Sequence, residues 1–144
     1  MDLATGCYPR FLFGGSTDCI LPVFHFHDVT PQSLEPYLVY LSDNGYQTVT
    51  SEKVNSFVLD GIYPGNKKVA LTFDDAWLSL WTVVLPLLKK YHLTAIAYVS
   101  PGRILDSGTV RPTMLDNEWN PSPVMNTDFT SWAELRAINE SGII

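Results

Sequence analysis

A continuous apolar run limits the folds that this chain can adopt. After Lys68, the segment Val69 to Phe73 carries apolar side chains and one threonine. Runs of this kind are typical of strands buried on both faces, which occur in parallel sheets covered by helices. Residues 94–99 form a second such run, and residues 77–92 between them place apolar side chains at helical spacing. The succession of strand, helix and strand predicts an α/β fold with a parallel sheet.

The segments before and after these runs extend the same alternation. Along the chain, we expect a strand at 20–27, a helix at 31–44, a strand at 46–50, a helix at 51–60 and a helix at 132–140. Thr30-Pro31 is a typical helix start, Ser51 can cap the next helix, and Ser131 with Glu134 forms a capping box. Pro86 is expected to kink or restart the helix at 77–92. Ile143-Ile144 indicate the start of another strand.

The length of the chain indicates an incomplete architecture. About four strand–helix units are present, whereas a closed (β/α) barrel typically needs roughly 200–250 residues. An open sheet would end in a bare edge. We therefore expect this chain to be part of a larger domain, or its edge to be covered by the missing barrel half or an oligomeric contact. We expect an N-terminal arm or loop at residues 1–18 and the incomplete domain at residues 19–144. Within the domain, residues 100–130 are expected to form a long loop that is functional or mobile.

Composition excludes several classes of protein. The chain has 15 acidic and 9 basic residues and a net charge of −6, which argues against nucleic-acid binding. No apolar run reaches the roughly 18 residues of a membrane span. The N-terminus lacks the basic and apolar regions of a signal peptide, so the compartment is left open. Cys7 and Cys19 are either two unrelated thiols or one disulfide closing the N-terminal loop.

Two carboxylates follow the first buried strand. Asp74 and Asp75 come directly after Phe73 and precede a helix. Functional sites of parallel α/β folds lie at the carboxyl ends of strands, and the helix N-terminus favours anions. Adjacent side chains at a strand end point in different directions, so one carboxylate can bind a cation while the other accepts a proton. The alternative is a helix-capping aspartate beside a solvated one.

At this motif the chain resembles the polysaccharide deacetylases with the NodB-homology domain, carbohydrate esterase family 4. The family's T-F-D-D-G motif stands here as Thr72-Phe73-Asp74-Asp75-Ala76. The resemblance covers residues 21–144, with 101–130 divergent. Its other matches are Leu21-Pro22-Val23 with Phe26-His27-Asp28-Val29, Asn44 to Val49, Leu85 to Tyr91 with Ala95 to Val99, and Ser131-Trp132 with Glu134-Leu135 and Ser141-Gly142.

The resemblance implies a fold, a reaction and two site residues. The fold is the N-terminal portion of a distorted, TIM-related (β/α) barrel, truncated before closure. The reaction is metal-assisted hydrolysis of acetyl groups on an N- or O-acetylated polysaccharide, in the bacterial envelope or secreted. Asp74 matches the general base and Asp75 a ligand of a divalent metal, zinc first, with cobalt, nickel or manganese as alternatives. Ala76 stands where the family motif has glycine. If this position has a positive φ, alanine costs about 1 kcal/mol relative to glycine.

The family completes its metal site with two histidines in H-x-x-x-H spacing, beyond the helix that ends near Gly142. This chain stops there, so we expect the 144 residues alone to bind metal weakly and to be inactive. The histidines that are present lie elsewhere: His92 is expected at the opposite end of the sheet, as a solvated or helix-capping residue. His25 and His27 share one face of a strand. They are expected to be packed or hydrogen-bonded, with an improvised His25/His27/Asp75 metal site as the alternative.

Two residues are candidates for the substrate cleft. His27 matches a family position near the site, and Trp77 lies at the functional end of the fold, where it can stack on a sugar or pack in the core. Two other functions stay open. One is a non-catalytic carbohydrate-binding or interaction module on a decayed deacetylase fold. The other is a glycosidase with paired carboxylates, which is disfavoured because adjacent residues rarely achieve the ~5–9.5 Å separation that it needs.

Overall fold

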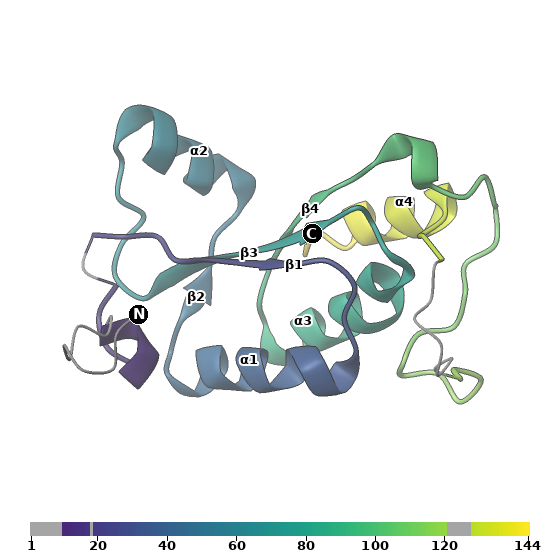
Figure 1. Ribbon diagram of the computed structural model, residues 1–144, viewed down its shortest axis with the longest axis horizontal. Helices are drawn as coiled ribbons and strands as arrows, with labels where there is room; N and C mark the ends of the chain where they lie inside the picture. The colour runs from purple at the N-terminus through teal and green to yellow at the C-terminus, as the bar shows by residue number, and fades with distance from the viewer. Residues whose placement is uncertain (1–9, 18, 121–127) are drawn as a thin grey trace.

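The computed structural model describes residues 10–17, 19–120 and 128–144. Within them, four parallel strands form one sheet around β3 (Lys68–Asp74). β1 (Val23–Phe26) pairs along one edge of β3, while β2 (Gln47–Thr48) and β4 (Ile96–Tyr98) pair with its beginning and its end. Figure 1 shows β3 running through the middle of the molecule. The predicted α/β class with a parallel sheet is confirmed, although β1, β2 and β4 are shorter than expected.

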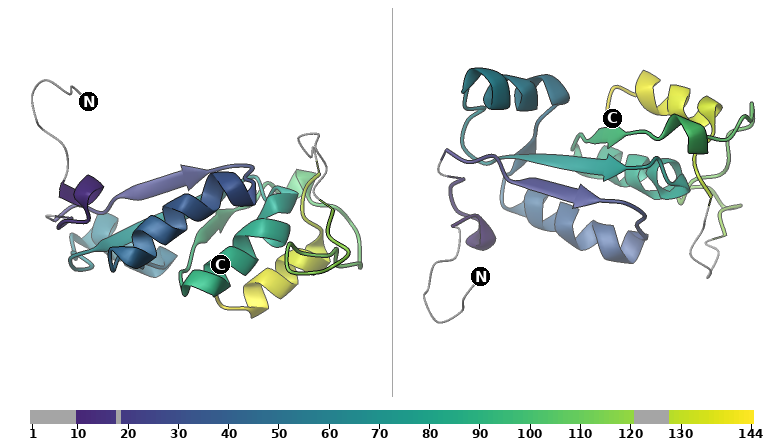
Figure 2. Two further views of the ribbon diagram at one scale, coloured as in Figure 1. Left: turned by 90° about the horizontal axis from the view of Figure 1, so that it is seen from below. Right: turned by 45° about the horizontal axis from the view of Figure 1, so that its top comes forward.

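The helices pack around this sheet. They are α1 (Pro31–Asp43), α2 (Ser51–Asp60), α3 (Leu85–Tyr91) and α4 (Trp132–Glu140), with short turns η1 (Arg10–Phe13), η2 (Leu80–Val84) and η3 (Pro101–Arg103). α1 and α3 lie side by side on one face of the sheet, and α4 packs next to them against η2 (Figures 1 and 2). None of the helices in the described ranges is long and apolar enough to cross a membrane.

Local sequence signals fix most helix ends. The Thr30 side chain accepts a hydrogen bond from the Ser33 backbone N–H, and Pro31 opens α1 as expected. The capping box of α4 is also formed, with Ser131 and Glu134 capping each other. For α2 the prediction is off by one residue: Thr50, rather than Ser51, takes the extended N-cap conformation. Boundaries of this kind are decided by backbone angles that composition does not specify.

The segment predicted as one helix over 77–92 is helical from Leu78 to Tyr91, but the type of helix changes along it. Trp77 forms an isolated bridge with Phe129, the helical residues begin at Leu78, and the π-helical turn η2 follows. Pro86 is the second residue of α3, and the backbone is helical on both sides of it, so the predicted restart is not observed. A proline within a helix removes one backbone hydrogen bond, and the turn before Pro86 is widened, with the Leu85 N–H donating to the Leu80 carbonyl. Trp77 itself lies outside the helix and beside the loop, where it pairs with Phe129.

The apolar core lies between the sheet and α1 and α3. Leu34, Leu38 and Leu41 of α1 are fully buried. Phe26 of β1 stacks on Phe73 of β3 with 5.2 Å between ring centroids. Phe11 of η1 is also buried, 4.9 Å from the ring of Tyr46, so part of the stretch expected as an arm contributes to the core.

Two expectations concern the ends of the chain. The Ala95 N–H donates to the Ile143 carbonyl at 2.9 Å, so the last residues lie beside the start of β4, although they are not assigned as a strand. Cys19 is an exposed free thiol. Cys7 lies outside the described residues.

Core packing through α1 yields a stability prediction. Leu38→Ala removes a fully buried side chain and is expected to lower the free energy of unfolding by about 3 kcal/mol. Leu59→Ala on α2 is the matched control, because Leu59 is 78% exposed, and its loss is expected to stay within about 0.5 kcal/mol. Urea denaturation measures both. Equal losses in the two variants would contradict the described core.

Candidate functional site

The pairing of β1 with β3 gathers polar side chains on one face of the sheet. His25 pairs with Thr72, and Phe26 with Phe73. Successive side chains of a strand point to opposite faces. Phe26 and Phe73 face the core around α1. The polar residues directly before and after each of them therefore face the other way. His25, His27, Thr72 and Asp74 therefore share the face opposite α1.

These side chains are close enough to interact. His25 Nδ1 lies 3.0 Å from Thr72 Oγ1, and His25 Nε2 lies 3.4 Å from Asp74 Oδ2. The rings of His25 and His27 meet edge to face, with 4.8 Å between centroids. One ligand atom each of His25, His27 and Asp74 falls within 4.8 Å of the others. Asp74 Oδ1 is buried and has no hydrogen-bond partner among the described residues.

Asp75 points to a different set of partners. Its Oδ1 accepts a hydrogen bond from Ser100 Oγ at 2.9 Å, and its Oδ2 lies 3.2 Å from Arg103 Nη1. Both partners follow β4. The two carboxylates thus separate, as expected for adjacent residues at a strand end. The improvised set of His25, His27 and Asp75 is wrong in its third member, because Asp74 takes the place beside the histidines.

The backbone after β3 is strained. Asp75 and Ala76 both have positive φ angles, 67° and 56°. This is the condition under which alanine in place of glycine costs about 1 kcal/mol. Consecutive residues other than glycine in this region are uncommon and persist where the surroundings fix them. The left-handed turn directs the Asp75 side chain toward η3 and away from Asp74.

Trp77 packs in an aromatic and cationic stack. Its ring lies on Phe129 with 4.7 Å between centroids, and the Arg103 guanidinium sits 5.3 Å from the Phe129 centroid. Arg103 therefore connects the stack to Asp75. Trp77 Nε1 is buried with no partner among the residues that the structure describes. The ring is half-buried, so it packs on Phe129 and retains some exposed surface.

His92 lies away from this site, at the other end of the sheet. It is the exposed C-cap of α3 in the left-handed conformation, with φ 54°. It lines a hollow with Tyr46 and Thr94, which precede β2 and β4 in the chain. This position agrees with the helix-capping or solvated role expected from the sequence.

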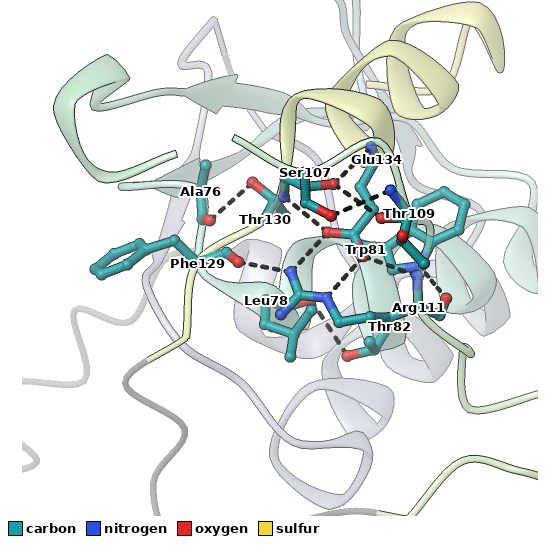
Figure 3. A network of polar contacts seen from close by, with 11 residues as sticks. Ala76, Leu78, Trp81, Thr82, Ser107, Thr109, Arg111, Phe129, Thr130 and Glu134 are labelled. Carbon is teal, nitrogen blue, oxygen red and sulfur yellow. Dashed lines mark hydrogen bonds and ion pairs between the residues drawn. The ribbon is translucent and has the colours of Figure 1, made fainter. Parts of the chain in front are cut away.

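A buried ion pair holds the long loop against α4 (Figure 3). Glu134 is fully buried, and its carboxylate accepts from Arg111 Nε at 2.8 Å and Arg111 Nη2 at 2.7 Å. Arg111 also donates to the Phe129 carbonyl at 2.6 Å. The next residue, Thr130, donates to the Ala76 carbonyl from both N–H and Oγ1. The network therefore positions Phe129 beneath Trp77 and braces the turn after Asp75.

The protonation of Glu134 follows from these contacts. Burial acts to raise the pKa of Glu134, but hydrogen bonds from the Arg111 guanidinium and from the Ser131 and Arg111 backbone outweigh it. The pKa of Glu134 is consequently below its ordinary value. The hydrogen bond to Glu134 likewise raises the pKa of Arg111. The pair is thus fully charged at neutral pH.

Sequence reasoning missed four residues that shape the site. They are Ser100, Arg103, Arg111 and Phe129. All four lie within or next to the long loop, where no periodicity signals which side chain turns inward. The one available signal was Glu134, the carboxylate of the capping box, which lies on the same helix face as Ile138. A carboxylate that is buried on such a face requires a cation as its partner.

Comparison with known proteins gives the family. The sequence model described as polysaccharide deacetylase matches residues 62–144, more than half of the chain. The matched residues include β3 and the carboxylate pair at its end, and the family is one of carbohydrate-modifying hydrolases. The chain belongs to the polysaccharide deacetylase family.

Individual relatives agree with this assignment. The chain is 29% identical over 87 residues to YxkH of Bacillus subtilis (strain 168), covering 55% of this chain and 31% of YxkH. It is 26% identical over 119 residues to the poly-β-1,6-N-acetyl-D-glucosamine N-deacetylase of Escherichia coli (strain K12), covering 83% of this chain and 17% of that protein.

A solved structure shows the same fold. The IcaB structure from Ammonifex degensii matches with a TM-score of 0.64 at 22% identity, over 85% of this chain and 49% of that one. The chain therefore spans about half of that solved chain and less than a third of YxkH.

The Glu134–Arg111 pair yields a stability prediction. Glu134→Gln leaves the Arg111 guanidinium without its buried counter-charge and is expected to cost about 3 kcal/mol of unfolding free energy. Glu140→Gln makes the same change at an exposed position of the same helix and is expected to have little effect. Chemical denaturation at pH 7 compares the two. A Glu134→Gln loss no larger than that of the control would contradict a structural role for the pair.

The same pair yields a pH prediction. Because the pKa of Glu134 is lowered on folding from its reference value of 4.5, its stabilising contribution is complete above that value. The contribution is lost as the pH falls through the lower folded-state pKa. The stability gap between the original chain and Glu134→Gln should therefore narrow from pH 5 toward pH 2. Denaturation midpoints of both proteins across this range measure the gap, and a gap that widened toward low pH would contradict the assignment.

Proposed function

We propose that this chain is part of a metal-dependent hydrolase that removes acetyl groups from an N- or O-acetylated polysaccharide. Family membership supports this proposal, as does the Escherichia coli relative, which is named as a poly-β-1,6-N-acetyl-D-glucosamine N-deacetylase. The observation that carries it is the separation of Asp74 and Asp75 at the carboxyl end of β3 into two environments. The parallel sheet would be the first portion of a distorted (β/α) barrel whose remainder covers the exposed edge.

Asp74 is proposed as the general base. Its Oδ2 faces the open side of the sheet beside His25, whereas Oδ1 is buried. In hydrolysis, the oxygen of a water molecule bonds to the acetyl carbonyl carbon, and Asp74 takes the proton that this water loses. The bond from the carbonyl carbon to the sugar nitrogen or oxygen then breaks. The leaving atom takes a proton from a general acid, which the resemblance assigns to a histidine outside these 144 residues.

Asp75 is proposed as the metal ligand that the resemblance implies, for zinc or alternatively cobalt, nickel or manganese. A divalent metal, when bound, supplies polarisation of the acetyl carbonyl. As the side chain lies here, both Asp75 oxygens are engaged by Ser100 and Arg103. A cation would have to displace the Arg103 guanidinium, and one carboxylate falls short of the three protein ligands of a catalytic zinc site. The arrangement around Asp75 therefore does not fit a metal without a change of partners.

The substrate cleft is proposed to include His27 and Trp77. His27 is exposed on the face that carries Asp74, next to the end of β1. Trp77 keeps part of its ring exposed while Phe129 fixes its plane, which is the arrangement that a sugar-stacking side chain needs. Both candidates lie at the carboxyl end of the sheet, where family members are expected to bind the glycan.

Two substitutions in the complete protein test the assignments. Asp74→Asn is expected to retain the catalytic metal and to lower acetate release by roughly 10²–10⁴-fold. Asp75→Asn is expected to lose the metal together with the activity. Asp60→Asn, at the exposed end of α2, is the control. Metal content by elemental analysis is read beside acetate release from an acetylated β-1,6-glucosamine oligomer, and near-normal turnover of Asp74→Asn would exclude it as the base.

The 144-residue chain alone separates an enzyme from a binding module. We expect it to release no acetate, because Asp75 lacks its two further ligands, and measurable release would refute this expectation. Saturable binding of the same oligomer in the presence of a chelator would instead favour the alternative of a non-catalytic carbohydrate-binding module.

A further inference from the structure

We propose that His25, His27 and Asp74 form a binding site for a divalent transition metal such as Zn²⁺, separate from the position at Asp75. This inference does not rest on the proposed function, since it concerns a different carboxylate and is measured by binding. The family resemblance assigns no metal to these residues, and His25 matches none of its motifs. The proposal is carried by strand register, interatomic distances and the hydrogen bonds of His25.

The register of β1 and β3 builds the ligand set into rigid structure. His25 and His27 are two residues apart on β1 and its end, and Asp74 ends the neighbouring strand, two residues after the partner of His25. All three side chains consequently project from the same face. Ligands that come from paired strands keep their spacing, because the backbone hydrogen bonds between β1 and β3 hold it.

The spacing suits a transition metal. His25 Nε2 and Asp74 Oδ2 are 3.4 Å apart. In a tetrahedral site with bonds of about 2.0–2.1 Å, neighbouring ligand atoms are separated by about 3.3–3.4 Å. The third ligand atom, on His27, lies within 4.8 Å of the other two, and its exposed imidazole can rotate toward them. Two imidazoles and one carboxylate favour zinc, cobalt or nickel over calcium or magnesium.

The hydrogen bonds of His25 prepare its ring for this role. Thr72 Oγ1 donates to the Phe24 carbonyl at 3.3 Å, so it accepts from His25 Nδ1–H at 3.0 Å. A neutral imidazole with its proton on Nδ1 presents a lone pair at Nε2. That lone pair faces a carboxylate oxygen of Asp74, and two acceptors facing each other at this distance attract a cation. Metal-binding histidines commonly have their other ring nitrogen fixed in this way.

The electrostatic setting distinguishes the two aspartates. Arg103 already places a positive charge 3.2 Å from Asp75 Oδ2, whereas Asp74 faces histidines that bind metals in their neutral form. With the partners that the two aspartates have in this chain, a metal therefore gains more at Asp74. If Asp74 is also the general base, a metal held here engages its carboxylate and prevents proton transfer, so excess zinc would inhibit the complete enzyme.

Calorimetric titration of the metal-stripped 144-residue chain with ZnCl₂ tests the site. Cysteines are replaced in all samples, as Cys7→Ser and Cys19→Ser, so that thiols supply no ligands. We expect one zinc ion per chain. His25→Ala and Asp74→Asn should each weaken binding on the order of 100-fold, whereas Asp75→Asn and His92→Asn should leave the affinity within about threefold. His92→Asn is the matched control, because asparagine tolerates the left-handed backbone of this exposed C-cap.

A second readout guards against loss of folding. Circular dichroism of the metal-free variants should match that of the parent, since His25 is half-exposed. Zinc should raise the thermal midpoint of the parent and of His92→Asn, but not of His25→Ala. The proposal is overturned if no zinc binds, if the affinity is unaffected by both His25→Ala and Asp74→Asn, or if Asp75→Asn abolishes binding while His25→Ala leaves it intact. The last result would place the metal at Asp75 and leave the proposed function standing.

Discussion

The pairing of β3 with three other strands is the constraint on which the rest of the structure depends. Its buried residues from Val69 to Phe73 hold β1, β2 and β4 in parallel register, and α1 and α3 cover the core side of the sheet. The same register places His25 beside Thr72 and ends the strand at Asp74. The polar site is thus a direct consequence of how an apolar strand is buried.

The carboxyl end of β3 shows how two adjacent carboxylates acquire different chemistry. Asp74 ends the strand and stays with the side chains of β1, while the positive φ of Asp75 turns it toward Ser100 and Arg103. Two non-glycine residues in the left-handed region cost free energy, so the surroundings must hold them. The hydrogen bonds from Thr130 to the Ala76 carbonyl, braced in turn by the Arg111–Glu134 pair, supply that restraint.

Features of the fold that depend on residues close together in the sequence could be predicted, whereas contacts between distant segments could not. The run before Asp74, the Thr30-Pro31 helix start and the capping box at Ser131 all act within a few residues, and the structure confirms each of them. The partners of Asp75 could not be predicted in this way, because Arg103 reaches it from a loop without periodicity. Trp77 directly precedes the helical residues that begin at Leu78, close to the expected helix start, but its stacking on Phe129 of the loop could not be predicted from local signals. The roles of Asp74, Asp75, His27 and Trp77 remain predictions.

The account's central claim is that the two aspartates have separate partners and separate roles. The most direct measurement is the position of a metal by anomalous X-ray diffraction from crystals of the 144-residue chain grown with zinc. The account predicts a peak about 2.0–2.2 Å from His25 Nε2 and from an Asp74 oxygen, with Arg103 still paired to Asp75. A peak bound to Asp75 alone, with Arg103 displaced and no metal beside His25, would contradict it.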